Sequence, residues 1–155
     1  MNREQGTRQK WLIQGLHYLL DTMFVVGIIV TVTLPFTVPR MAVYYPQIQD
    51  RQWEVILIYF MLGVFCLFAL QELRRIFATV KEGNCFVEKN VVSLQRMGNV
   101  FLVIALVLLI RGVVYLTPAI VIECFLFLLA GLFCRVIAMV FAEAVRYKEE
   151  NDLTI

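Results

Sequence analysis

The stretch LLIRGVVYLTPAIVIECFLFLL (Leu108–Leu129) is an almost unbroken run of apolar residues with a turn signal, Thr117-Pro118, near its centre. Proline lacks an amide hydrogen and is common at the first position of a helix, so Pro118 is a natural helix start. On each side of the turn the apolar run continues for about 20 residues, the length that a helix needs to cross the hydrocarbon core of a membrane. The stretch therefore predicts two antiparallel membrane-spanning helices joined by a tight turn.

The composition of the whole chain points the same way. Of 155 residues, 61% are hydrophobic and only 17% are charged, and the mean hydropathy is +0.78. A soluble domain averages about 45–50% apolar residues with glycine included, and about 25% charged residues. A chain of this length cannot bury the excess in its own core, so we expect lipid to cover it. The net charge of +2 is small, and we expect no direct binding of nucleic acid.

The hydropathy pattern predicts four spans, at about residues 17–38, 53–71, 98–116 and 119–143. None of them alternates apolar and polar residues with a period of two, as the strands of a membrane barrel do. We therefore expect a single all-α membrane domain, an antiparallel bundle of four transmembrane helices, with a loop at 72–97 and a tail at 144–155. Pro35 and Pro39 predict the end of the first helix.

The basic residues predict the orientation of the bundle, because lysine and arginine favour the cytoplasmic side of a membrane. The N-terminal tail, the loop and the C-terminal tail together carry ten of them: Arg3, Arg8, Lys10, Arg74, Arg75, Lys81, Lys89, Arg96, Arg146 and Lys148. The opposite side carries only Arg40 and Arg51. Both termini are therefore predicted to be cytoplasmic.

Four charged residues inside the spans are candidate site residues: Asp21, Arg111, Glu123 and Arg135. Arg111 lies six residues before Thr117 and Glu123 five after Pro118, so both lie about 8–9 Å from the turn. We expect an ion pair between them that locks the hairpin. The alternatives are a polar cavity or proton path, and separate snorkelling of each side chain to the interface. Asp21 is the expected partner of Arg135.

Nothing in the sequence points to an enzyme. There is no arrangement of paired carboxylates, Ser-His-Asp or Cys-His residues at catalytic spacing, and no phosphate-binding loop. The four cysteines form no CxxC pair, and His17 is the single histidine. We therefore expect neither a metal site nor a cofactor.

The segment after the second span has its own pattern. Apolar residues recur at helical spacing from Leu73 to Val80, which predicts that the second helix continues beyond the membrane. Gly83-Asn84 predicts a break, and a short helix with an apolar stripe from Val87 to Leu94 is expected to follow. This stripe can pack on the membrane interface, on the extended second helix, or on a cytoplasmic partner.

Two segments carry a resemblance to a known family, GNCFVEKNVVSLQRMG (Gly83–Gly98) and EENDLTI (Glu149–Ile155). The chain resembles the domain-of-unknown-function 2975 family, which consists of small bacterial four-span membrane proteins. The first segment is similar to the family pattern G-x-P-F-x-x-x-N-x-x-x-L-x-x-x-G, except that Cys85 stands where proline is expected. The second is similar to the family's acidic-x-DLT-aliphatic ending.

The resemblance implies a place in the bacterial cytoplasmic membrane. Members of the family are often encoded beside a small helix-turn-helix regulator, which implies a partner of that class. The candidate partner-binding residues are those that match the two motifs: Phe86, Asn90, Leu94, Asp152, Leu153, Thr154 and Ile155. We therefore expect a protein that binds or sequesters such a regulator. The alternative is a small transporter, channel or immunity-type protein that uses the intramembrane charges, and a homo-oligomer is compatible with either.

Overall fold

The computed structural model describes residues 2–44 and 49–152, and all regular structure in these residues is helical. Four helices in this part of the chain are long and apolar enough to cross a membrane: α1 (Asn2–Ala42), α3 (Gln52–Lys81), α4 (Glu88–Val114) and α5 (Pro118–Asp152). α1, α3 and α5 each contain one predicted span, and α4 contains the span predicted at 98–116 except for its last two residues. The expected all-α fold with four spans is confirmed, and it indicates a multi-pass membrane protein.

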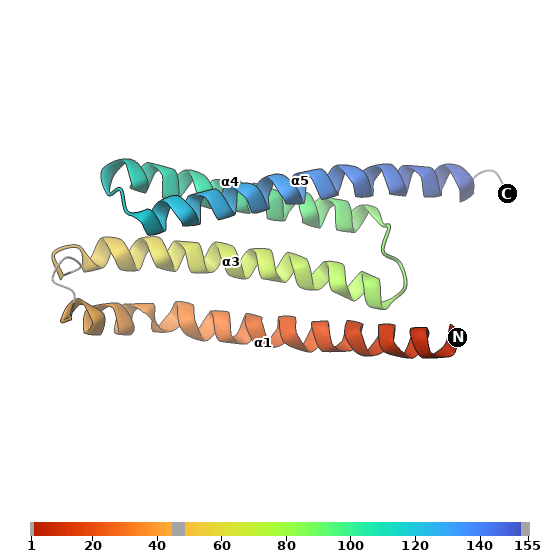
Figure 1. The fold of residues 1–155 in the computed structure, drawn as a ribbon, viewed down its shortest axis with the longest axis horizontal. Helices are drawn as coiled ribbons and strands as arrows, with labels where there is room; N and C mark the ends of the chain where they lie inside the picture. Colours follow the sequence, from red (N-terminus) through yellow and green to blue (C-terminus); the bar gives the residue numbers. More distant parts are fainter. Residues whose placement is uncertain (1, 45–48, 153–155) are drawn as a thin grey trace.

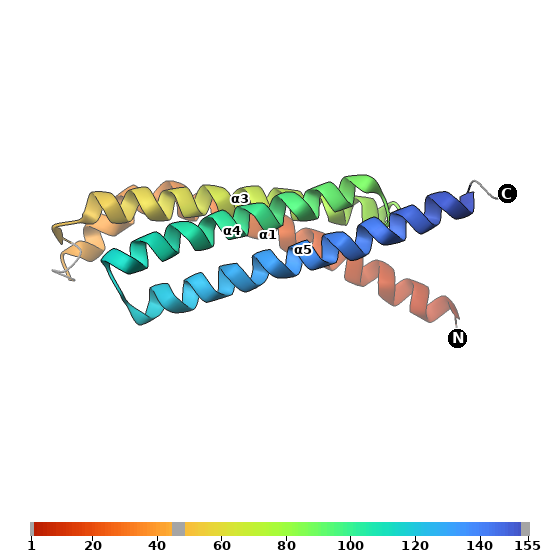
Figure 2. The same ribbon diagram turned by 90° about the horizontal axis from the view of Figure 1, so that it is seen from above.

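The helices pack against their neighbours in chain order, each antiparallel to the one before (Figure 1). α1 packs on α3, α3 on α4, and α4 on α5, whereas no Cα atom in the described part of α1 lies within 8 Å of one in α5. The bundle is therefore open, with α1 and α5 as its outer helices, and the ends of these two helices diverge (Figure 2). We call the end that holds the start of α1, residues 82–87 and the end of α5 the loop end, and the other the turn end.

The α3–α4 loop begins where the sequence predicts it. Gly83 has a φ of 80°, in the left-handed region that glycine adopts without strain. Its N–H donates to the carbonyl of Val80, and the N–H of Asn84 donates to that of Thr79, both at 3.1 Å. These two bonds satisfy carbonyls that the last turn of α3 would otherwise leave unpaired. The predicted break at Gly83-Asn84 is confirmed.

Two predicted helix boundaries are wrong. Pro35 and Pro39 lie inside α1, which continues to Ala42. Membrane helices tolerate proline because leaving the helix would expose more unpaired backbone groups to lipid. The short helix expected after Val87 is not separate either, since α4 runs from Glu88 through Gly98 without interruption. Of the three placements open to its apolar stripe, the structure shows packing on α3.

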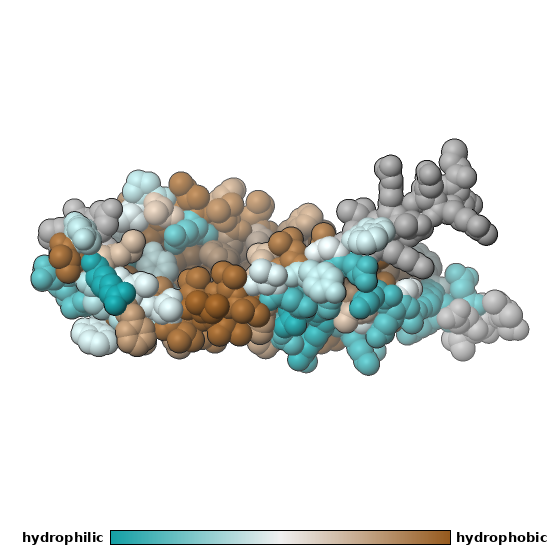
Figure 3. All heavy atoms as spheres, turned by 90° about the horizontal axis from the view of Figure 1, so that it is seen from below, coloured by the Kyte–Doolittle hydropathy of each residue, from teal (hydrophilic) through white to brown (hydrophobic). Residues whose placement is uncertain are grey.

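Helices α3 and α4 are longer than the membrane requires. The 30 residues of α3 span about 45 Å, against about 30 Å for the hydrocarbon core. If residues 52–71 fill the core, residues 72–81 project beyond it at the loop end, beside residues 88–97 of α4. Figure 3 shows the same division on one face, with hydrophobic residues over the middle of the molecule and hydrophilic residues gathered toward the loop end.

The buried core is small. One cluster near the loop end joins α3, α4 and α5: Ala69, Ile76, Leu94, Met97 and Ala138. A second, nearer the turn end, is formed by Leu62, Ile104 and Leu108. Large apolar side chains elsewhere stay exposed, such as Val113 at 83% and Phe133 at 64%. Exposed apolar surface on this scale needs a lipid solvent, as the composition predicts.

Two glycines set the distance between α4 and α5. A Cβ atom added to Gly98 would lie 3.1 Å from the carbonyl oxygen of Gly131, and one added to Gly131 would lie 3.2 Å from that of Gly98. The backbones therefore touch where the two helices cross. Small residues permit such close approach in membrane helices, where packing takes the place of the hydrophobic effect.

Candidate functional site

A buried carboxylate joins α3 to α4 at the loop end. Glu72 has no exposed surface, although it directly follows the second predicted span. Ser93 Oγ donates to its Oε2 at 2.7 Å, Arg75 Nη1 to its Oε1 at 2.8 Å, and Arg96 Nη1 to the same oxygen at 3.4 Å. A buried charge is tolerated only when it is paired and hydrogen-bonded in this way. Glu72 therefore links the two helices and holds two guanidinium groups in place.

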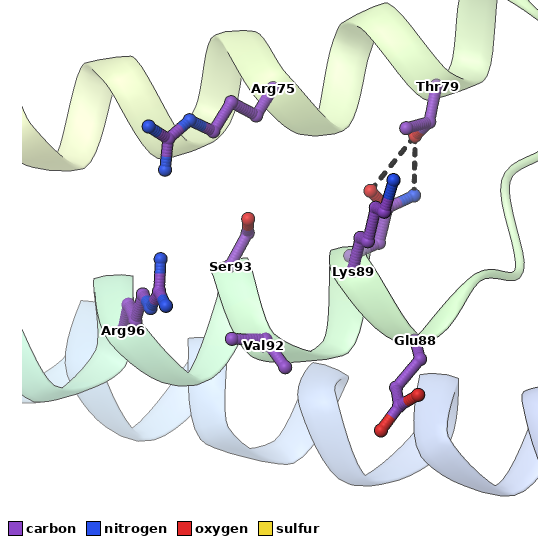
Figure 4. Close-up of a pocket in the computed structure, with 8 residues that line it drawn as sticks. Arg75, Thr79, Glu88, Lys89, Val92, Ser93 and Arg96 are labelled. Carbon is purple, nitrogen blue, oxygen red and sulfur yellow. Dashed lines mark hydrogen bonds between the residues drawn. The ribbon is translucent and has the colours of Figure 1, made fainter.

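A second polar contact fixes the loop itself. Asn90 is 1% exposed, and its Nδ2 donates to Thr79 Oγ1 at 2.7 Å and to the carbonyl of Cys85 at 2.8 Å. One amide thus connects α4, α3 and the intervening loop. The contact between Thr79 and the unlabelled asparagine is drawn as dashed lines in Figure 4.

Between these two contacts lies a cleft of about 470 Å³, which we call the loop-end cleft. Seven of the eight residues that line it are polar or charged: Arg75, Thr79, Glu88, Lys89, Asn90, Ser93 and Arg96, with Val92 as the eighth. Figure 4 shows the guanidinium groups of Arg75 and Arg96 entering the space between the helices from opposite walls, while Glu88 points away from α3. Both arginine side chains are 55% exposed. With Lys89, the two arginines place three cations at one opening, and these can bind a carboxylate or a phosphate.

The structure divides the residues predicted to bind a partner. Asn90 and Leu94 are buried at 1% and 8%, so they offer little surface to a partner, although Asn90 is one of the residues that line the loop-end cleft. The helical period of the motif places both on the face of α4 that packs on α3. Phe86 is 46% exposed and its ring lies 5.3 Å from that of Phe141, which ties the loop to α5. Leu153, Thr154, Ile155 and the side chain of Asp152 lie outside the described residues.

The structure does not show the predicted ion pair between Arg111 and Glu123, since no nitrogen of Arg111 lies within 4.0 Å of a carboxylate oxygen of Glu123. The two residues have similar depth, but Arg111 points toward α3, with its guanidinium carbon 5.6 Å from the centre of the Tyr59 ring. The neighbouring Gly112 faces α5, because a Cβ atom there would lie 3.3 Å from Ile120 Cγ2. Successive residues of a helix differ by about 100° in direction. Arg111 therefore lies on a different face of α4 from the one that meets α5.

The predicted contact between Asp21 and Arg135 fails for a different reason. Asp21 Oδ1 lies 2.7 Å from Arg74 Nη2, and Asp21 Oδ2 lies 3.6 Å from His17 Nε2. Arg135 donates instead to Asn99 Oδ1 of α4. Because α1 and α5 are the outer helices of the row, residues at matching depth on them cannot meet.

Exchanging the charges of Asp21 and Arg74 tests this assignment. Asp21→Arg should lower the free energy of unfolding by about 1–3 kcal/mol, because it removes the ion pair with Arg74 and places two cations together. Adding Arg74→Asp should restore most of that loss, as measured by thermal unfolding in detergent. Adding Arg135→Asp instead is the control and should not. Rescue by Arg135→Asp would contradict the assignment.

A family model described as "Protein of unknown function (DUF2975)" matches residues 36–155 of the chain. The matched segment contains α3, α4 and α5 in full, and with them every residue of the loop-end cleft. No curated protein and no solved structure matches the chain.

Proposed function

This chain belongs to the DUF2975 family of proteins of unknown function, and we propose that it is a non-enzymatic membrane protein whose loop-end cleft binds an acidic segment of a cytoplasmic partner. The observation that carries the proposal is the cleft of about 470 Å³, which Arg75, Lys89 and Arg96 line. The family resemblance implies the class of partner, a small helix-turn-helix transcriptional regulator. Holding such a regulator at the membrane would keep it from DNA.

The rigidity of the cleft supports binding. The carboxylate of Glu72 accepts hydrogen bonds from Arg75 and Arg96, and Asn90 joins α4, the helix that carries Lys89, to Thr79 of α3. Cations that are already held in place lose little conformational entropy when a ligand binds, so the ligand binds more tightly. A guanidinium has five N–H donors, and half of each arginine side chain remains exposed, so donors are left for a ligand.

The distribution of charge supports a cytoplasmic cleft. The loop end carries seven basic residues that follow α1 in the sequence: Arg74, Arg75, Lys81, Lys89, Arg96, Arg146 and Lys148. If these basic segments stay in the cytoplasm, as the positive-inside rule states, the cleft is within reach of a soluble regulator. We propose the cytoplasmic membrane of a bacterium as its location.

The decisive variant is Lys89→Glu, because Lys89 is exposed and lines the cleft without taking part in the Glu72 or Asn90 contacts. Lys148→Glu is the matched control, an exposed lysine at the same end but on α5. Each protein would be tagged at its N-terminus and purified from native membranes in mild detergent, and bound proteins would be identified by mass spectrometry. We expect a stoichiometric helix-turn-helix protein with the wild type and with Lys148→Glu, and at least about tenfold less with Lys89→Glu. Equal recovery with both variants would contradict the proposal.

A transporter or channel that uses the intramembrane charges has less support. Such a path requires the charges to line one cavity. Asp21 instead pairs with Arg74 between α1 and α3, Arg111 faces α3 from α4, and Arg135 bonds to Asn99. Charges on three different interfaces do not favour a common path.

A further inference from the structure

Arg111 occupies a second pocket, at the turn end between α3 and α4, that has no role in the proposed function. The pocket measures about 370 Å³ and is lined by four aliphatic side chains together with Arg111, Glu54 and Tyr115. Nε and Nη1 of Arg111 are buried, and neither has a hydrogen-bond partner among the described residues. A buried donor without an acceptor is destabilising, so the pocket needs an occupant that brings one.

The pocket lies near the end of the bundle, where the polar headgroups of the membrane are expected. Arg111 is three residues, or about 4.5 Å along the axis, from Val114 at the end of α4. Tyr44 and Trp53, near the facing ends of α1 and α3, are 82% and 77% exposed. Exposed tyrosine and tryptophan are typical of the membrane interface. The guanidinium of Arg111 is therefore expected at the level of lipid phosphate groups.

The local charge favours an anion. Arg51 adjoins the pocket, since its guanidinium carbon lies 4.0 Å from the centre of the Tyr115 ring. Glu54 lines the same pocket but forms no ion pair with Arg111 within 4.0 Å. Arg51, Arg111 and Glu54 together carry a net charge of +1. A planar guanidinium can bond two phosphate oxygens at once, which suits the group that the membrane supplies at this depth.

We propose that Arg111, with Arg51 beside it, binds the phosphate of a membrane phospholipid. One acyl chain lies along the aliphatic wall that α3 and α4 supply. The guanidinium of Arg111 turns toward the phosphate and donates hydrogen bonds to its oxygens, which gives acceptors to donors that are otherwise buried without one. The site is independent of the loop-end cleft, which lies at the other end of the same two helices.

The test is the thermal unfolding of the purified full chain in detergent, titrated with short-chain phosphatidylglycerol. The phospholipid should raise the unfolding midpoint of the wild type. In Arg111→Gln the apparent dissociation constant should rise about tenfold or more, as expected for the loss of a charged hydrogen bond. Arg135→Gln, which removes an intramembrane arginine bonded to Asn99, should keep the response to the lipid.

Two further probes separate the sources of phosphate. Diacylglycerol of the same chain length and inorganic phosphate should each leave the midpoint unchanged at concentrations where the phospholipid acts. Equal protection by inorganic phosphate would overturn the assignment to a lipid. An unchanged lipid response in Arg111→Gln would overturn the site itself. So would an equal fall of the unfolding midpoint without lipid in Arg111→Gln and Glu54→Gln, because that result would show that the two residues form an internal ion pair.

Discussion

Replacing Glu72 by alanine should lower the free energy of unfolding by about 3 kcal/mol. The carboxylate is fully buried and accepts bonds from Ser93, Arg75 and Arg96, so its removal leaves a buried hydroxyl unpaired, opens a cavity and separates two cations from their counter-charge. The same change should weaken binding of the partner, because it releases two of the three cations that line the loop-end cleft.

Glu143→Ala is the matched control. Glu143 also pairs with an arginine three residues away, Arg146, at 2.6 Å, but its side chain is 49% exposed. Exposed ion pairs contribute about 0–1 kcal/mol, so this variant should unfold close to the wild type. Chemical or thermal unfolding of both variants in the same detergent is the measurement. Equal losses would show that burial of Glu72 does not matter.

The second large effect is expected at the crossing of α4 and α5. Gly131→Leu should lower the free energy of unfolding by about 3 kcal/mol or more, since even a Cβ atom there would lie 2.9 Å from Leu102 Cγ and 3.2 Å from the carbonyl oxygen of Gly98. The helices must separate to admit a larger side chain, and overpacking of this kind destabilises tightly packed interfaces.

Gly15→Leu is the control for helix propensity. Gly15 also lies in a helix, but no atom lies within 4 Å of the position that its Cβ would occupy. Leucine forms helices better than glycine, so this variant should be as stable as the wild type or slightly more stable. Thermal unfolding and the resistance of α5 to limited proteolysis would be compared. If Gly131→Leu matches Gly15→Leu in both, the close crossing is not a source of stability.

The sequence correctly predicted the features that depend on local patterns along the chain. Hydropathy located the four helices, and the turn at Thr117-Pro118 and the break at Gly83-Asn84 follow from local backbone chemistry. The apolar period from Leu73 to Val80 correctly predicted that the second helix continues past its span, and α3 ends at Lys81. Each of these inferences needs only residues that are close in the chain.

The contacts between helices could not be predicted in the same way. Depth in the membrane is one coordinate, and a contact also requires the right helix face and the right neighbour. Arg111 had the right depth on the wrong face, and Asp21 and Arg135 lie on helices that do not touch.

Glu72 was missed because a charged residue just after a span normally lies in water. The available signal was the pair of apolar stripes that follow it, since two projecting amphipathic helices bury their stripes most simply against each other and cover what lies between them.

Photo-crosslinking in living cells tests the central claim most directly. A photoreactive amino acid would replace Val92, an exposed residue that lines the loop-end cleft. In a control it would replace Leu109, an exposed residue of α4 toward the turn end. We predict one discrete adduct from position 92, to a soluble helix-turn-helix protein that mass spectrometry identifies, and we predict that this adduct disappears when Lys89→Glu is added. No soluble adduct at position 92, or the same adduct with Lys89→Glu present, would contradict the claim that this cleft binds a cytoplasmic partner.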